Sequence, residues 1–349
     1  MPTLIFQFSW FPAVCIWPSA SNDPGCIRHR QSLQQLHLFH GDSSLSIRSC
    51  SRDCHSGPLS HDSTGRPSII TSISCLFGHI LGASSLHRVT VVKLGGSVIT
   101  HKSASPPRVN HEAVKRIALE LKGYNGNLVI VLGGGAHGHQ AAHRFGFGDP
   151  KTPKERLLAG VPAIRHNMTL LSMQVERIMQ NVGIPAAVFS PFSFVQMHDG
   201  SVSSFPMELI QRALQTGLTV VTHGDVCFDD IRGASILSGD TILVHIAEIL
   251  DAESVYIGTD VDGVYEADPR DKPNATMIPI IDKSNMNQVM LGASSSKATD
   301  VTGGMTAKLA ELTKLAGKKR EIAVFNLSVP GRLEALLSRK PVLCTRIIL

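Results

Sequence analysis

The stretch Val91-Val92-Lys93-Leu94-Gly95-Gly96-Ser97 decides the fold of this chain. An apolar run leads directly into a lysine, a pair of glycines and a serine, an order typical of a buried strand that ends in a tight turn. Glycines let the backbone approach an anion and leave N–H groups available to bind it. The stretch therefore predicts a phosphate site at a strand end, although on its own it fits a surface turn with an exposed lysine equally well.

A second strand end repeats this pattern. The apolar run 128–132 ends in Gly133-Gly134-Gly135, and Ala136-His137-Gly138-His139 follows where a helix is expected to begin. A helix N-terminus attracts anions, and His139, expected in the first turn, can donate to a phosphate oxygen. Two such strand ends in one domain predict two anionic groups held close together. A metal site at His137 and His139 is the weaker interpretation, because no carboxylate or cysteine completes the ligand set.

Two later motifs place carboxylates at the end of a strand or the start of a helix. Asp225, in His223-Gly224-Asp225, follows an apolar strand, and we expect it to orient the phosphate-binding lysines; an Asx turn is the alternative. Gly239 and Asp240 follow Ser238 where a helix is expected to begin, and helix capping explains that pattern as well as a binding role does.

Two further motifs point to a nucleotide. Thr259 and Asp260 open residues 259–265 (TDVDGVY) after a strand, where they can hold a base or a ribose, although an ordinary acidic turn is the simpler interpretation. Gly304 and Lys308 lie in residues 302–308 (TGGMTAK), where a glycine pair opens a helix. A lysine near a helix N-terminus is unfavourable, and an anionic ligand would offset that cost, whereas a solvated helix face would simply tolerate it.

Strands and helices alternate from residue 89 onward. This alternation indicates βαβ units in a largely parallel sheet with helices on both faces. Turn signals predict hairpins at 194–205 and 227–237 and an irregular loop at 268–275. The expected strands are 89–94, 127–132, 185–189, 218–222, 254–258 and 321–325. The expected helices are 110–122, 137–146, 154–181, 206–216, 240–251 and 304–317.

Residues 1–88 differ from the rest of the chain. They contain no Lys and no Glu, they are rich in Ser, Arg and His, and they hold five of the seven cysteines. Three interpretations stay open: a targeting peptide, a disordered extension, or sequence absent from the mature protein. A zinc site at Cys50, Cys54 and His55 lacks a second ligand pair. We therefore assign 1–88 to an extension and 89–349 to a single domain, whose isolated Cys227 and Cys344 suit free thiols in a reducing compartment.

Composition restricts the class of partner. With 349 residues and 43% hydrophobic content, the chain can bury a large core. Its net charge of +5 comes without a dense Lys/Arg stripe, which argues against a nucleic-acid partner. No apolar run approaches the roughly 18–20 residues that span a bilayer, so no membrane partner is expected. A small anionic molecule is the remaining expectation.

The motifs KLGGS, GGGAHGH, HGD, SGD, TDVDGVY and TGGMTAK, in this order, resemble the amino acid kinase family over residues 89–349. Within that family they are most similar to the branch that phosphorylates isopentenyl phosphate, chiefly because of His139 and residues 190–195 (SPFSFV). The resemblance implies a three-layer αβα sandwich, a cytoplasmic homodimer, and transfer of the γ-phosphoryl group of ATP, with Mg²⁺, to isopentenyl phosphate. If residues 1–88 are a transit peptide, an organelle replaces the cytoplasm.

The resemblance also implies roles for the matching residues, without any protein ligand for a metal. It implies that Lys93, Leu94, Gly95, Gly96 and Ser97 hold the ATP phosphates, together with Gly135, Gly304 and Lys308. Thr259 and Asp260 lie by the nucleotide, while Gly134, His139, Gly239 and Asp240 serve the acceptor. Lys102 stabilises the transition state, and the catalytic set is Lys93, Lys102, His139, Asp225 and Lys308. Two features depart from the family pattern: His at position 137, where Phe is usual, and the proline-bearing loop 268–275.

The expected chemistry needs little from the protein beyond positioning and neutralisation of charge. A phosphate acceptor is already anionic near neutral pH, so no general base is required, and His139 acts as a donor and charge partner. Val161, Ile164, Met168 and Leu171 can line a pocket for the hydrocarbon tail, although core packing explains their spacing better. The alternatives are a kinase of another small phosphate or phosphonate, and a nucleotide-binding sensor or storage protein without turnover.

Overall fold

A computed structural model describes residues 88–293, 304–317 and 319–348 of the chain. Among these residues, eight strands form the main sheet, and four shorter strands form a second sheet. The strands of the main sheet are β1 (Val89–Leu94), β2 (Asn127–Leu132), β3 (Ala186–Val188), β6 (Thr219–His223), β9 (Ser254–Thr259), β12 (Ile280–Asp282), β13 (Glu321–Asn326) and β14 (Cys344–Ile348). The second sheet contains β4 (Gln196–His198), β5 (Ser201–Ser204), β7 (Asp225–Asp229) and β8 (Gly233–Leu237), and β10 (Val264–Tyr265) pairs with β11 (Met277–Ile278).

Helices connect most of these strands. Four belong to the first half of the described chain: α2 (Gly96–Ile99), α3 (His111–Leu121), α4 (Gly135–Arg144) and α5 (Lys154–Asn181). The others are α6 (Glu208–Gln215), α7 (Gly239–Ile249), α8 (Met286–Ala293), α9 (Gly304–Thr313) and α10 (Arg332–Leu337), with a 3₁₀ turn, η1 (Pro191–Ser193).

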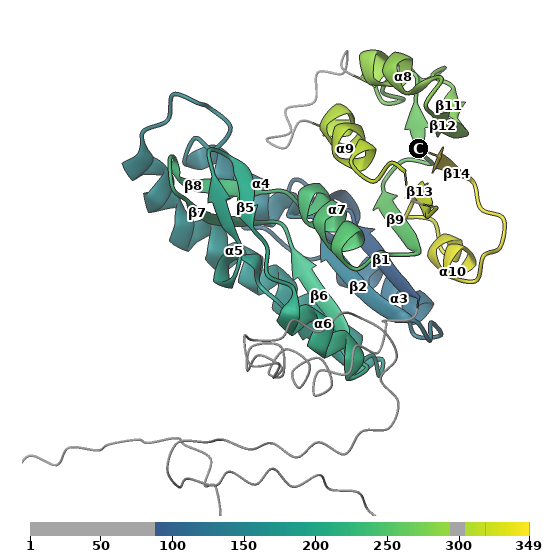
Figure 1. Cartoon of the computed structure of the whole chain (residues 1–349), viewed down its shortest axis with the longest axis horizontal. Coiled ribbons are helices and arrows are strands. Elements are labelled where there is room, and N and C mark those ends of the chain that lie inside the picture. The colour runs from purple at the N-terminus through teal and green to yellow at the C-terminus, as the bar shows by residue number, and fades with distance from the viewer. Residues whose placement is uncertain (1–87, 294–303, 318, 349) are drawn as a thin grey trace, which may run out of the picture. The chain divides into compact units, whose positions relative to one another are not determined.

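The first glycine-rich stretch follows β1, which lies in the middle of the main sheet. The strand order is β12-β14-β13-β9-β1-β2-β6-β3, so β1 lies between β9 and β2 (Figure 1). Neighbouring strands run parallel except β13 and β14, which are antiparallel. The carboxyl ends of β1, β2, β6 and β9 therefore meet along one edge of the sheet, which is where open α/β sheets bind ligands.

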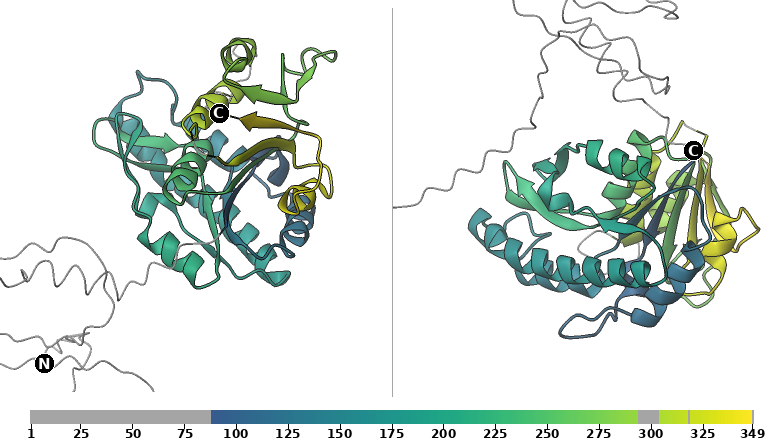
Figure 2. Two further views of the ribbon diagram at one scale, coloured as in Figure 1. Left: turned by 45° about the vertical axis from the view of Figure 1, so that its right-hand side comes forward. Right: turned by 90° about the horizontal axis from the view of Figure 1, so that it is seen from below.

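Helices cover both faces of the main sheet, as Figures 1 and 2 show. On one face, Val92 and Leu94 of β1 pack in a core with α3, α4, α5 and α10. On the other face, Val89 and Val91 pack in a core with α6, α7, α8 and α9. Alternate residues of β1 point to opposite faces and both faces are buried, which explains why β1 is apolar throughout. The three-layer αβα fold with a largely parallel sheet is confirmed.

The predicted elements are mostly found. All six predicted strands are present, with ends that differ by at most one residue, and both predicted hairpins are present, as β4–β5 and β7–β8. In the first hairpin, Asp199 and Gly200 have φ values of 45° and 80°, the left-handed turn that a two-residue hairpin favours. The loop 268–275 contains neither helix nor strand.

Several elements were not predicted, namely α2, α8, α10, β10, β11, β12 and β14. The strand β14 is the most consequential of these, because it reverses the direction of the sheet beside β13. The five residues of β14 include a Thr and an Arg, so they form no long apolar run. Its antiparallel partner, β13, is not adjacent to it in the sequence. Long-range pairing of this kind has no local signature.

The predicted extension and its cysteines fall almost wholly outside the described residues. In residues 88–293, 304–317 and 319–348, no helix combines the length and apolarity needed to cross a membrane.

Candidate active site

The two glycine-rich turns lie directly against each other. The N–H of Gly133 donates to the carbonyl of Leu94 over 2.9 Å, which joins the end of β2 to the end of β1. A Cβ atom on Gly96 would lie 2.3 Å from the nitrogen of Gly135, and a Cβ atom on Gly135 would lie 2.7 Å from the carbonyl oxygen of Gly96. Gly135 also has a φ of +48°. The turns therefore meet backbone to backbone, and a side chain at either position would separate them.

A threonine couples the same turns through its hydroxyl. The Oγ1 atom of Thr100, which follows α2, donates to the carbonyl of Gly96 over 2.7 Å and accepts from the N–H of Ala136 over 3.2 Å. The helix α4 begins at Gly135, two residues earlier than expected, so His139 starts its second turn instead of lying in the first.

A cavity of about 790 Å³ opens at the carboxyl ends of β1, β2 and β9. All six sequence motifs contribute to its wall, so the structure brings together residues that are more than two hundred positions apart. The predicted site residues that line it are Lys93, Gly95, Gly96, Ser97, Lys102, Gly134, Gly135, His139, Asp225, Gly239, Asp240, Thr259, Asp260 and Lys308.

Asp240 holds two of the cavity lysines. Ser238 caps α7 by accepting from the N–H of Thr241 over 3.0 Å, which places Asp240 in the first helical turn. One carboxylate oxygen of Asp240 lies 2.6 Å from Nζ of Lys93 and 3.1 Å from Nζ of Lys308. Burial acts to raise the pKa of Asp240, but the two ammonium groups lower it to about 2. The carboxyl is therefore ionised throughout the physiological range and gathers cations from β1 and α9.

The structure corrects the role expected of Asp225. Its carboxylate pairs with the guanidinium of Arg165 on α5 and accepts from the hydroxyl of Ser190 over 3.2 Å. Burial raises the pKa of Asp225, and the nearby His223 and Arg165 oppose that rise. The strand was predicted to end at residue 222 and ends at His223, and the next strand, β7 of the second sheet, begins at Asp225 itself. Asp240 takes the position beside the lysines that we had expected for Asp225.

At one end of the cavity His139 lies near apolar side chains. Ala142 of α4 and Ile164 and Met168 of α5 line this part of the wall. The sulfur of Met168 would lie 3.3 Å from a Cβ atom on Gly138, so α4 and α5 pack closely beneath the second glycine turn. A histidine side chain and an apolar surface therefore share this end.

The four candidate tail-pocket residues divide into two pairs. Ile164 and Met168 line the cavity, whereas Val161 and Leu171 are buried within the core and do not appear in the cavity wall. All four side chains are buried in the same core, so core packing, the preferred explanation of the stripe, accounts for their spacing, and two of them line the cavity as well.

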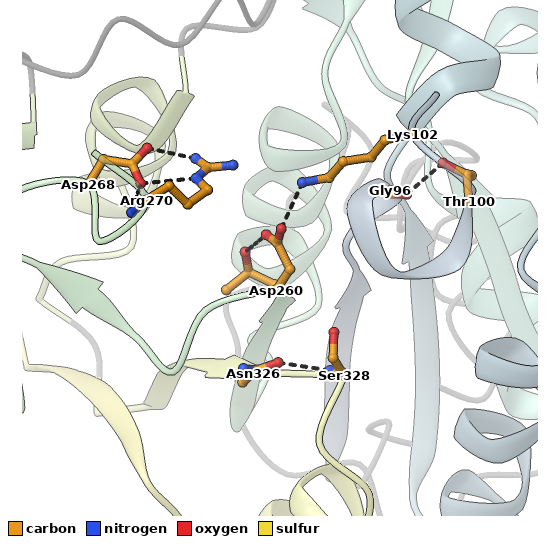
Figure 3. A network of polar contacts seen from close by, with 9 residues as sticks. Gly96, Thr100, Lys102, Asp260, Asp268, Arg270, Asn326 and Ser328 are labelled. Atoms are coloured by element: carbon orange, nitrogen blue, oxygen red, sulfur yellow. Dashed lines mark hydrogen bonds and ion pairs between the residues drawn. The ribbon is translucent and has the colours of Figure 1, made fainter. Parts of the chain in front are cut away.

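The opposite end carries two ion pairs, which Figure 3 shows. Lys102 lies between α2 and α3, and its Nζ is 2.7 Å from a carboxylate oxygen of Asp260, just after β9. The hydroxyl of Thr259 donates to the other oxygen of Asp260 over 3.3 Å. In the loop that follows, Asp268 accepts from Nε and Nη2 of Arg270 over 2.9 and 2.7 Å.

Two predicted nucleotide-binding residues, Leu94 and Gly304, are not among the residues that line the cavity. Leu94 is fully buried in the core, so its side chain cannot contact a nucleotide, and its carbonyl joins the two turns instead. Gly304 begins α9, the helix that supplies Lys308.

Sequence reasoning missed two arginines. Arg270 was not named, but it lines the cavity, in a loop that the family resemblance implies lies by the nucleotide. Arg165 had no signal, because an arginine on a long amphipathic helix is usually solvent-facing.

Known proteins resemble this chain over the region that contains the cavity. The family model described as "Amino acid kinase family" matches residues 88–326. The isopentenyl phosphate kinase of Methanothermobacter thermautotrophicus is 35% identical over 263 residues, which cover 74% of this chain and 98% of that protein. The isopentenyl phosphate kinase of Arabidopsis thaliana is 34% identical over 201 residues, 54% of this chain and 60% of that protein. An X-ray structure of an isopentenyl phosphate kinase matches with a TM-score of 0.65 at 32% identity, covering 74% of this chain and 100% of the other.

Proposed function

Because this chain belongs to the amino acid kinase family, we propose that it is an isopentenyl phosphate kinase, which uses ATP to convert isopentenyl phosphate to isopentenyl diphosphate. In this reaction an oxygen of the acceptor phosphate forms a bond to the γ-phosphorus of ATP. The bond from that phosphorus to the oxygen bridging the β- and γ-phosphates breaks, and ADP leaves. The similar kinases of that name from archaea and from a plant support the assignment.

The observation that carries the proposal is the composition of the cavity end at His139. A kinase of a carboxylate substrate would need polar groups beyond the reacting oxygen. Here Gly134 and His139 offer donors to an anion, while Ala142, Ile164 and Met168 present only apolar atoms beside them. A phosphate on a small hydrocarbon fits that combination.

Positioning and charge neutralisation account for the proposed catalysis. Two polyanions must be held together against their repulsion, and Lys93 and Lys308, paired with Asp240, supply cations in the wall of the same cavity as the glycine turns. The backbone N–H groups of the turns and the imidazole of His139 are further donors. The acceptor oxygen is already anionic near neutral pH, so the mechanism needs no general base. Removing one such donor typically lowers the rate by about 10²–10³.

Magnesium fits the site as a companion of the triphosphate. In the described part of the chain, no group of three or more His, Cys, Asp or Glu side chains is placed to hold a metal ion. The cavity carboxylates Asp240 and Asp260 are already paired with lysines, so the ATP phosphates would supply the main ligands. When bound, Mg²⁺ would neutralise charge on the donor phosphates.

A substrate panel with purified protein tests the proposal. Isopentenyl phosphate is expected to give ADP with the highest kcat/KM among small phosphates and phosphonates. In His139→Ala, the KM for isopentenyl phosphate is expected to rise about 10- to 100-fold, since a charge-assisted hydrogen bond is lost, while ATP affinity is retained. The control is His143→Ala, which removes an exposed histidine from the same helix.

Unchanged kinetics in His139→Ala would contradict the assignment of the acceptor end. Preference for another phosphate would favour the other kinase that the sequence left open. Absence of ADP with every acceptor would favour a nucleotide-binding protein without turnover.

The proposal extends to organisation of the molecule. We assign the catalytic domain to residues 89–349 and expect it to form a homodimer in the cytoplasm, as the family resemblance implies. Light scattering during size-exclusion chromatography tests the dimer, and mass spectrometry of the native N-terminus tests whether residues 1–88 are retained.

A further inference from the structure

A carboxylate lies at the phosphate-binding end of the cavity, where it would repel ATP. Asp260 lines the cavity, and the side chain of Ser97, in the first glycine turn, hydrogen-bonds to it. The side chain of Asp260 is 29% exposed, so its charge is only partly screened by water. Like charges a few ångströms apart at such a site repel strongly. When no nucleotide is bound, this charge can be balanced by a nearby cation.

Lys102 is that cation. Its Nζ lies 2.7 Å from Asp260, and the segment that carries it is anchored on both sides of the contact. The N–H of His101 donates to the carbonyl of Arg108 over 3.0 Å, and Gln140 of α4 donates to the carbonyl of Ala104 over 3.0 Å. The pair thus joins an anchored segment to the residue that follows β9, and both partners line the cavity.

The electrostatics of Asp260 agree with this contact. Burial acts to raise its pKa, but the hydrogen bond and charge of Lys102, with the hydrogen bond from Ser97, hold the pKa below its ordinary value. The carboxylate is therefore ionised and paired in the absence of nucleotide.

We propose that Asp260 is a positioning residue that holds Lys102 across the cavity mouth while the nucleotide end is empty, and that the incoming triphosphate displaces Asp260 from Lys102. Lys102 then exchanges one anionic partner for another. Ion pairs between partly exposed side chains are weak, whereas a triphosphate offers more charge and more acceptor oxygens, so the exchange is favourable. The proposal rests on the proposed function in one respect, which is that a nucleotide binds at the end of the cavity that contains Asp260.

A neighbouring ion pair, formed by Asp268 and Arg270, leaves a second cation near Asp260 after Lys102 has been released. Arg270 lies near Lys102 and Asp260, and its guanidinium is bonded to Asp268 (Figure 3). The hydrogen bond that Arg270 donates to Asp268 is the main cause of the raised pKa of Arg270, and the charge of Asp260 adds to it. Arg270 is therefore a second cation near Asp260, and Lys102 is the one bonded to it.

A double-mutant cycle of Asp260→Asn and Lys102→Gln tests the exchange. Binding of ADP and of inorganic tripolyphosphate is measured by calorimetry without Mg²⁺ and without acceptor. Asp260→Asn is expected to tighten binding about three- to tenfold, because no ion pair has to break and no carboxylate repels the ligand. Asp260→Asn is expected to tighten binding more in the protein that retains Lys102 than in Lys102→Gln. Only in the protein with Lys102 does the substitution remove an ion pair that the ligand would otherwise have to break.

Three outcomes would overturn the proposal. A larger gain in the Lys102→Gln background would mean that the pair persists in the complex and shields Asp260. Equal gains would mean that Lys102 takes no part. Weaker binding in Asp260→Asn would make Asp260 a direct ligand of the nucleotide, or of the metal if the loss occurs only when Mg²⁺ is added.

The matched control is Asp262→Asn, in the same segment. The carboxylate of Asp262 is bonded to Arg332 at 2.6 Å and to Asn326 at 3.1 Å, and it does not line the cavity. No tightening is expected there. The readout is independent of turnover, so an inactive protein that shows the expected coupling would refute the proposed function and leave the exchange standing.

Discussion

Single residues set the charge balance of the cavity. Lys93 and Lys308 would repel each other if they were unpaired, and Asp240 lies within 3.1 Å of both. The two lysines reach this carboxylate from different layers of the fold, one from the central sheet and one from a covering helix. The lysine geometry at the phosphate end therefore depends on one buried side chain.

Asp240→Asn is expected to lower kcat about 10²-fold, because both lysines lose the charge that positions them. Steady-state kinetics under saturating substrates measures the effect. Asp225→Asn is the matched comparison, since it removes a buried carboxylate that pairs with Arg165 instead, and its loss of kcat is expected to be below about tenfold. If Asp225→Asn proves the more damaging variant, the carboxylate that orients the lysines is Asp225 after all.

Asp240 also predicts a pH dependence of stability. Its pKa is lowered to about 2 in the folded chain, so its contribution is fully present above the unfolded pKa and is lost as pH falls through the folded value. The wild-type free energy of unfolding should therefore fall more steeply than that of Asp240→Asn between about pH 4 and pH 2, by a difference of about 2 kcal/mol. Urea unfolding across this range measures the difference, and parallel curves would contradict it.

At the scale of elements, the site depends on how closely two strand ends approach. The turns after β1 and β2 touch through Gly96 and Gly135, and a Cβ atom on Gly95 would lie 2.5 Å from the carbonyl oxygen of Gly258 at the end of β9. Three adjacent strand ends are thus packed at backbone distance. This packing creates a wall of N–H groups without side chains, which a phosphate can approach closely.

Gly96→Ala is expected to destabilise the protein by about 2–3 kcal/mol, because the added methyl group would force the two turns apart. Its activity should fall as well, since the nucleotide and acceptor ends share that contact. Gly123→Ala is the control, because nothing lies within 4 Å of a Cβ atom there. Urea denaturation of both variants gives the comparison, and an equally stable Gly96→Ala would show that the turns can separate at little cost.

At the scale of the whole molecule, the described residues form their own hydrophobic cores on both faces of the sheet. The unit that contains them extends from Gly78 to Leu349. Strands from both halves of this unit alternate in the sheet, with β9 beside β1 and β6 beside β2, so the domain cannot be divided without breaking the sheet.

A protein shortened to residues 88–349 is therefore expected to fold and to retain activity. Its Tm should lie within about 2 °C of that of the full chain, which corresponds to a change in stability below about 1 kcal/mol. Calorimetry and the kinase assay on both proteins test the domain assignment. Aggregation or loss of activity in the shortened chain would show that residues 1–87 contribute to the fold.

Local sequence determined most of the described strands and helices, and the two glycine turns, of this protein. Strand and helix periodicity act over a few residues, and glycine requirements act at single positions, so both can be read without the fold. The parallel sheet followed from the alternation of elements, and the six motifs lie around the cavity at its strand ends. Most of the predicted site residues therefore line the cavity.

Only the tertiary structure decided which charges pair. Asp225 and Asp240 look alike in the sequence, because each follows a glycine at a strand end or at a helix start. In the structure, Asp225 pairs with Arg165, whereas Asp240 pairs with Lys93 and Lys308. The reversal of β14 and the contact of Lys102 with Asp260 also join segments that are distant in the chain. Such contacts depend on the packing of whole layers, which no local pattern encodes. The stretch from Val91 to Ser97 predicted a phosphate site, and the structure showed which carboxylate holds its lysine.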